Sequence, residues 1–114
     1  MKSFYLFLLF CLIASICFSQ KLSSGTYIFK YCDYEYNKCL STCKVIIKGD
    51  KIYLYALEGL SAPKGTLLES GNIMRHKSGK WIIGKSPKDK YKSIGDYENG
   101  VPEIDFKRKK VWQF

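Results

Sequence analysis

Apolar and polar positions alternate along short runs through most of the chain beyond residue 24. Runs such as residues 25–31, 51–56 and 103–106 are rich in aromatic and β-branched side chains, and turn-forming residues separate them. Alternation with a period of two is typical of a strand that buries one face. Beyond residue 19 no stretch repeats apolar residues at helical spacing for three turns, so helix is expected only in short pieces, such as residues 57–61.

The clearest predicted element is a hairpin across residues 45–56. Two strand-like runs flank the dipeptide Gly49-Asp50. Glycine at the first central position suits a type II′ turn, because the twist of that turn matches the twist of the flanking strands.

Further turns are expected at Ser70-Gly71 and at Ser78-Gly79. The first would make residues 66–76 a second hairpin, and the second would lead the chain into a strand over residues 80–84. Residues 85–102 contain two prolines and several lysines, and they are predicted to form a long surface loop.

These strands, about seven or eight in all, predict an all-β fold: one small antiparallel meander that closes as a barrel or folds over as a sandwich. Alternation within each run also predicts which side chains point inward, and an error of one residue in register would invert that set. The predicted inward set is Tyr27, Phe29, Val45, Ile47, Ile52, Leu54, Leu67, Ile73, Trp81, Ile83, Ile104, Phe106 and Trp112.

Residues 1–19 have the organisation of a signal peptide: a short positive start, an apolar run, and small residues at Cys17 and Ser19. We expect cleavage between Ser19 and Gln20, which leaves residues 20–114 as an exported domain, secreted or periplasmic. The alternative is an uncleaved membrane anchor. The apolar run is at most about 17 residues, shorter than the roughly 20 that a bilayer needs, which disfavours the anchor. No membrane span is expected after cleavage.

Positive charge dominates the predicted mature domain. Residues 20–114 carry 18 of the 19 Lys and Arg and all ten Asp and Glu, a formal net charge of +8. Residues 64–114 account for +6 of this net charge. A strongly basic exported domain is attracted to anionic polymers and surfaces. The alternative is that the lysines serve solubility and blunt strand edges.

Basic residues gather in three groups, with Trp81, Tyr91 and Trp112 among them. Basic side chains beside exposed aromatics suit polymeric anions. Lysine outnumbers arginine and lacks its planar fork, so we expect salt-dependent binding with no specificity for a nucleic acid. The first group is Arg75, Lys77 and Lys80. The residues predicted to bind ligand form the other two groups: Lys85, Lys88, Lys90, Lys92, Lys107, Arg108, Lys109 and Lys110.

Three cysteines remain after the predicted cleavage: Cys32, Cys39 and Cys43. In an oxidising compartment one pair should close as a disulfide. We expect Cys32–Cys43, because these residues flank a polar loop and would face each other at the ends of two strands. Cys39–Cys43 is the alternative. The spacing does not match a zinc site, so no metal is predicted.

Catalytic and cofactor motifs are not evident. The one histidine, His76, lies between Arg75 and Lys77 with no acidic residue close in sequence, and a strand histidine is the expected role. The chain has no G-x-x-x-x-G-K and no G-x-G-x-x-G, and no cofactor is predicted.

These features predict a non-enzymatic binding module at the cell surface or outside the cell, with an anionic polymer or a protein as its partner. In outline the predicted mature domain is similar to small exported barrels such as lipocalin-like domains. That resemblance implies an alternative function, a carrier for a small apolar ligand. An enzyme of unknown class is the second alternative.

Overall fold

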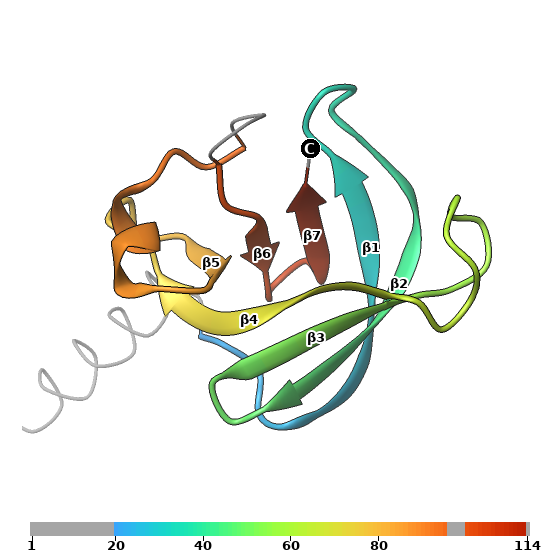
Figure 1. Ribbon diagram of the computed structural model, residues 1–114, viewed down its shortest axis with the longest axis horizontal. Helices are drawn as coiled ribbons and strands as arrows, with labels where there is room; N and C mark the ends of the chain where they lie inside the picture. Colours follow the sequence, from blue (N-terminus) through green and yellow to red (C-terminus); the bar gives the residue numbers. More distant parts are fainter. Residues whose placement is uncertain (1–19, 96–99, 114) are drawn as a thin grey trace, which may run out of the picture.

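Residues 20–95 and 100–113 are described by a computed structural model, in which seven strands follow one another along the chain (Figure 1). Each strand is antiparallel to the next, and the order around the sheet is the order of the chain. This confirms the predicted all-β meander. The elements are β1 (Gly25–Asp33), β2 (Lys38–Lys48), β3 (Lys51–Ala56), β4 (Leu67–Arg75), β5 (Trp81–Gly84), the 3₁₀ helix η1 (Pro87–Tyr91), β6 (Glu103–Asp105) and β7 (Lys110–Gln113).

The sheet closes into a barrel because β7 pairs with β1. This one contact is parallel, with Lys30 opposite Lys110 and Tyr31 opposite Val111. A meander with an odd number of strands must close in this way, since its first and last strands run in the same direction. Figure 1 shows the two strands side by side. Of the two predicted closures, the barrel is therefore the one adopted.

Inward side chains from all seven strands fill the barrel. The Phe106 ring meets Phe29 edge-on at 6.3 Å between ring centroids and Trp81 at 5.9 Å. Tyr27 and Trp81, both predicted to point inward, are partly buried against this core. The other predicted residues that are buried here are Phe29, Val45, Ile47, Ile52, Leu54, Ile73, Ile83, Ile104 and Phe106.

Leu67 was predicted to face inward, and this is wrong: its side chain is 49% exposed. The register of β3 against β4 shifts here, with Leu54 opposite Glu69 but Tyr55 opposite Leu67. Leu68 is therefore the extra residue of a bulge. The bulge reverses the alternation of β4, turning Leu67 outward and leaving Glu69 on the inner face.

The inward prediction for Trp112 also fails. Val111 is fully buried and lies opposite Ile104 in the β6–β7 pair. Because side chains alternate along a strand, Trp112, the next residue, points outward. Trp112 is half-buried, and its ring lies 5.5 Å from that of Tyr34 between centroids. The same phase places Gln113 on the inner side.

The predicted turn between β2 and β3 is confirmed. Lys48 lies opposite Lys51, which leaves Gly49 and Asp50 as the two-residue loop. Gly49 has φ +62°, and Asp50 is not among the residues with positive φ, as a type II′ turn requires. The Asp50 carboxylate also pairs with the ammonium group of Lys21.

The predicted turn at Ser70-Gly71 does not form, because β4 continues through it from Leu67 to Arg75. Glycine serves a different purpose here. A Cβ at Gly71 would lie 2.7 Å from the Gly84 carbonyl oxygen and 3.0 Å from the side chain of Ile83. Gly71 therefore allows β4 and β5 to approach closely, a common reason for glycine inside a strand. The predicted turn at Ser78-Gly79 does join β4 to β5.

The helical piece lies outside the predicted place. Residues 57–61 form turns and bends, whereas η1 occupies part of the predicted loop over residues 85–102. Ile94 and Val101 add an isolated bridge within that segment. A Cβ at Gly84 would lie 3.1 Å from Asp89 Cβ, which shows how tightly η1 packs against the end of β5.

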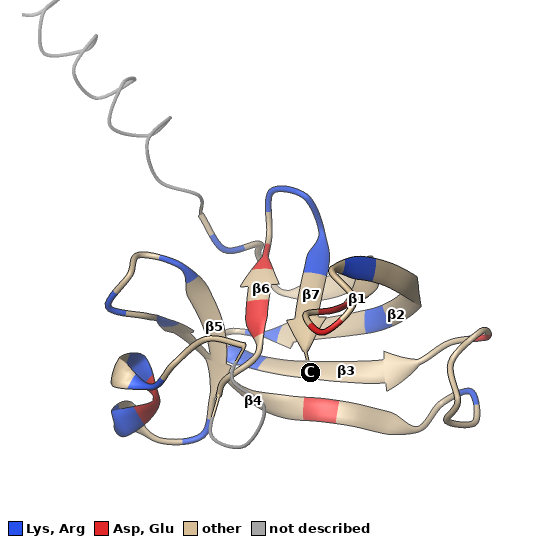
Figure 2. Cartoon of the chain, turned by 90° about the horizontal axis from the view of Figure 1, so that it is seen from above, with Lys and Arg blue, Asp and Glu red and all other residues tan. Residues whose placement is uncertain are grey.

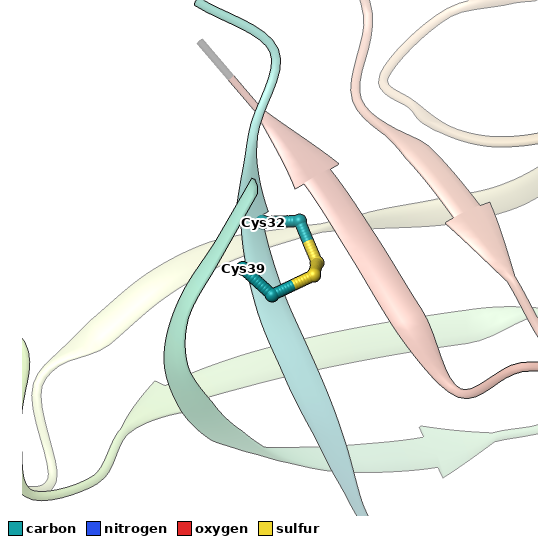
Figure 3. The surroundings of a disulfide bond; sticks show 2 residues. All are labelled: Cys32 and Cys39. Carbon is teal, nitrogen blue, oxygen red and sulfur yellow. A yellow bond between two sulfur atoms is a disulfide. The ribbon is translucent and has the colours of Figure 1, made fainter. Parts of the chain in front are cut away.

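The disulfide joins Cys32 to Cys39 (Figure 3), so the predicted Cys32–Cys43 bond is wrong. The two bonded residues lie opposite each other on β1 and β2. Cys43 instead pairs with Phe29, three positions from Cys32 on β1, or about 10 Å along a strand. Cys39 and Cys43 lie four positions apart on β2, about 13 Å. Both separations exceed the roughly 7 Å that a disulfide can span between Cα atoms.

Residues 1–19, the predicted signal peptide, lie outside the described part of the chain. Within the part that is described, no helix has the length and apolar character needed to cross a membrane.

Candidate basic surface

Two basic stretches that are separate in the sequence meet where η1 packs against the β4–β5 turn, on the left in Figure 2. The main-chain N–H of Lys77 donates to the Lys90 carbonyl at 3.0 Å. The ring of His76 donates from Nε2 to the Lys92 carbonyl at 2.6 Å. We call the resulting group the basic corner: Arg75, Lys77, Lys88 and Lys90.

Two of the predicted binding lysines are committed to ion pairs. Lys85 Nζ lies 3.4 Å from Glu69 Oε1, and Lys92 Nζ lies 3.0 Å from Asp89 Oδ1. Their charge is therefore partly neutralised, and both help to hold the segment that carries η1.

Lys77, Lys88 and Lys90 remain as exposed cations. No carboxylate within residues 20–95 and 100–113 forms an ion pair with any of them. Arg75 also holds the β4–β5 turn. Its guanidinium lies 4.0 Å from the Trp81 ring centroid, and its Nη1 donates to the Gly79 carbonyl at 2.6 Å. Exposed ammonium groups can bind anionic groups as point charges, and hydrogen bonds fix the main chain that carries them here.

A surface pocket of about 360 Å³ adjoins the basic corner. It is hollowed between β4, η1 and the β2–β3 turn, so an anionic group beside Lys90 could also reach a concave, partly polar surface. Its lining residues are Asp50, Asn72, Ile73, Met74, Arg75, Pro87 and Lys90.

The other predicted group occupies the β6–β7 turn, which Figure 2 shows at the top, apart from η1. Arg108 is tied to Asp105: its main-chain N–H donates to the carboxylate at 3.0 Å, and its guanidinium lies 3.6 Å away. Lys109 adopts φ +54° to turn the chain, and Lys107 is exposed. The eight predicted residues, which include Lys110 at the start of β7, therefore do not form one cluster.

Asp89 fixes the position of η1. Its Oδ2 accepts the main-chain N–H of Lys85 at 2.6 Å and that of Ser86 at 3.3 Å. The Lys85 N–H, followed by the Lys92 ammonium, lowers the pKa of the Asp89 carboxyl from its usual value. Asp89 is only 5% exposed, so it holds the loop as a carboxylate inside the structure.

His76 is also buried, and both of its ring nitrogens have partners. Nδ1 accepts the main-chain N–H of Ser78 at 3.1 Å, which requires the ring proton to be on Nε2. Nε2 then donates to the Lys92 carbonyl. His76 thus links the β4–β5 turn to the segment after η1. It lies just beyond the end of β4 at Arg75, and not within a strand as expected.

Inside the barrel a polar chain that the sequence did not indicate links β1, β7 and β4. The Tyr31 hydroxyl donates to Gln113 Oε1, and Gln113 Nε2 donates to Glu69 Oε2 at 3.3 Å. Burial raises the pKa of Tyr31 above its usual value. Glu69, together with Lys85, lines a second pocket of about 290 Å³. The signal that could have revealed this chain is the correct phase of β7, which places Gln113 on the inner side.

Comparisons with protein-family models, curated proteins and solved structures found no match. The described residues also contain no group of three or more His, Cys, Asp or Glu that could hold a metal ion. Function is therefore inferred from the side chains and their placement.

Proposed function

We propose that this protein is a non-enzymatic binding module, exported from the cell, that holds anionic polymers at its basic corner. The observation that carries the proposal is the junction of two basic stretches by the Lys77–Lys90 and His76–Lys92 hydrogen bonds. The junction holds Lys77, Lys88 and Lys90 in one exposed region without a described carboxylate partner. Separate point charges of this kind favour polymers with closely spaced anionic groups.

The alternatives receive less support from the same residues. His76 uses both ring nitrogens to hold main-chain groups, which leaves neither free to act as a base. The pockets beside Arg75 and Glu69 are both lined by charged side chains, and neither favours a small apolar ligand.

The test uses heparin, a sulfated polysaccharide, as the probe, and measures affinity as a function of salt concentration. Neutralising the basic corner with Lys77→Gln, Lys88→Gln and Lys90→Gln should weaken binding at low salt. It should also reduce the slope of log affinity against log salt by about 2.1 to 2.7, at about 0.7 to 0.9 for each of the three lost contacts.

A matched control removes the same charge elsewhere, with Lys64→Gln, Lys107→Gln and Lys109→Gln, all at exposed positions outside the basic corner. This control should retain most of the affinity and slope. Equal losses in the two variants would mean that net charge alone attracts heparin, and the proposed site would be wrong.

A further inference from the structure

The outer surface of β1 to β4 carries two continuous rows of side chains, defined by the strand register. One row runs Ile28, Lys44, Tyr55 and Leu67, each opposite the next on the neighbouring strand. The row beside it runs Thr26, Ile46, Tyr53 and Ser70. We call this surface the lysine–tyrosine face and define it as Ile28, Lys30, Lys44, Ile46, Lys48, Lys51, Tyr53, Tyr55 and Leu67.

The segments of β1, β2 and β3 that form this face carry positive charge only. Residues 26–30, 42–48 and 51–55 contain four lysines and no acidic residue. Lys30, Lys48 and Lys51 are exposed, and Lys44 is half-buried. Charge complementarity therefore favours an anionic partner for this surface.

Apolar groups lie among these charges. Ile28 is 54% exposed and Leu67 is 49% exposed, which places uncovered aliphatic surface at both ends of one row. Lys44 Nζ lies 5.5 Å from the centroid of the Tyr55 ring. Lys48 Nζ lies 5.8 Å from that of Tyr53. The two ammonium groups thus lie over tyrosine rings on the outer side of the sheet.

We infer that the lysine–tyrosine face binds the surface of an anionic lipid membrane. Aliphatic side chains for the acyl boundary, half-buried tyrosines and lysines for the headgroups are the chemistry that interfacial binding requires. A hydrophilic polymer would gain nothing by covering Ile28 and Leu67. A second copy of the face would bring lysine against lysine.

This inference does not depend on the proposed function. The lysine–tyrosine face lies on β1 to β4, whereas the proposed polymer site lies at η1 and the β4–β5 turn. Vesicles and heparin therefore test the two surfaces separately, and either proposal can fail alone.

The experiment measures sedimentation with vesicles of phosphatidylcholine alone and with vesicles that also contain phosphatidylglycerol. It uses the chain that begins at Gln20, because the barrel closes within residues 25–113. Association is expected only with the phosphatidylglycerol vesicles. Ile28→Ser with Leu67→Ser should reduce partitioning by about tenfold. Lys30→Gln with Lys48→Gln should reduce it by roughly 25-fold, about fivefold for each lysine.

The control is Tyr91→Ser, which removes a side chain that is 71% exposed but lies on η1. It should bind vesicles like the parent chain, and the Ile28→Ser/Leu67→Ser variant should keep its heparin affinity and its thermal unfolding midpoint. The inference is wrong if the parent chain ignores both vesicle types. It is also wrong if the Ile28→Ser/Leu67→Ser variant partitions like its parent, since charge alone would then explain association.

Discussion

A single buried carboxylate holds the segment that completes the basic corner. Asp89 accepts main-chain N–H groups from Lys85 and Ser86 and pairs with Lys92 on the other side of η1. Such charge-assisted hydrogen bonds need the ionised form, because a protonated carboxyl would turn one acceptor oxygen into a donor. The lowered pKa of Asp89 is the expected result.

The stability of the protein should therefore depend on pH through Asp89. Its pKa is lower in the folded chain than in the unfolded chain, so its contribution is complete above about pH 4 and is lost as the pH falls through the folded value. Asp89→Asn should lower the free energy of unfolding by about 1–2 kcal/mol near neutral pH, and the difference from the parent should shrink in acid.

Urea unfolding at a series of pH values measures this effect, with Glu58→Gln as a control, because Glu58 is exposed. A constant difference between Asp89→Asn and its parent across the acid range would contradict a role for the ionised carboxylate.

For single residues, the sequence predicted most of the side chains that point into the barrel. It missed those whose direction depends on a bulge or on the phase of a short strand. His76 was expected within a strand, but it lies just beyond β4, where its ring nitrogens hold two main-chain groups. Leu67 and Gln113 could not be placed, because one extra residue in β4 and a one-residue choice in β7 decide which way they point. The Tyr31–Gln113–Glu69 chain was missed because the phase of β7 decides whether Gln113 points inward.

Among the elements, the β1–β2 hairpin is cross-linked by the Cys32–Cys39 bond, which joins two residues that lie opposite each other. The bond closes a short loop, with a sequence separation of seven. Restricting the unfolded chain over a loop of this length contributes about 2–3 kcal/mol. Cys39→Ala, with Cys32 also replaced by Ala, should lower the unfolding free energy by that amount.

Peptide mapping checks the pairing directly. Burial raises the pKa of the Cys43 thiol to about 11, so Cys43 should resist alkylation in the native protein. In unreduced but denatured protein it should be the labelled cysteine within residues 20–113. A label on Cys39 would instead support the Cys32–Cys43 bond.

The same distinction between local and distant causes applies to the hairpins. Gly49-Asp50 and Ser70-Gly71 are both turn-like dipeptides, yet only the first turns the chain. Gly71 instead lies within β4, where the carbonyl oxygen of Gly84, a residue distant in sequence, leaves no room for a side chain. Turn propensity cannot separate these two uses of glycine.

At the scale of the whole molecule, closure of the barrel brings distant segments into contact. The basic corner combines residues near 77 with residues near 90, and the sequence showed both as basic without showing that they meet. The lysine–tyrosine face likewise exists only because four strands lie in one register. Composition predicted a basic domain, whereas the assembly of these two surfaces depends on tertiary pairing.

Closure itself depends on β7, which joins β6 to β1 and covers two strand edges. Ending the chain after Lys109 would leave both edges unpaired and would remove the fully buried Val111 from the core. Because exposed edges recruit other chains, this truncation should aggregate or lose its near-ultraviolet circular dichroism, which chromatography and spectroscopy would reveal. A full-length control with Trp112→Ser keeps the main-chain pairing and changes only a half-buried ring, so it should elute like the parent chain with a modest loss of stability. Native-like behaviour of the truncated chain would show that β1 and β6 tolerate open edges, and that the parallel β1–β7 contact is not what closes the fold.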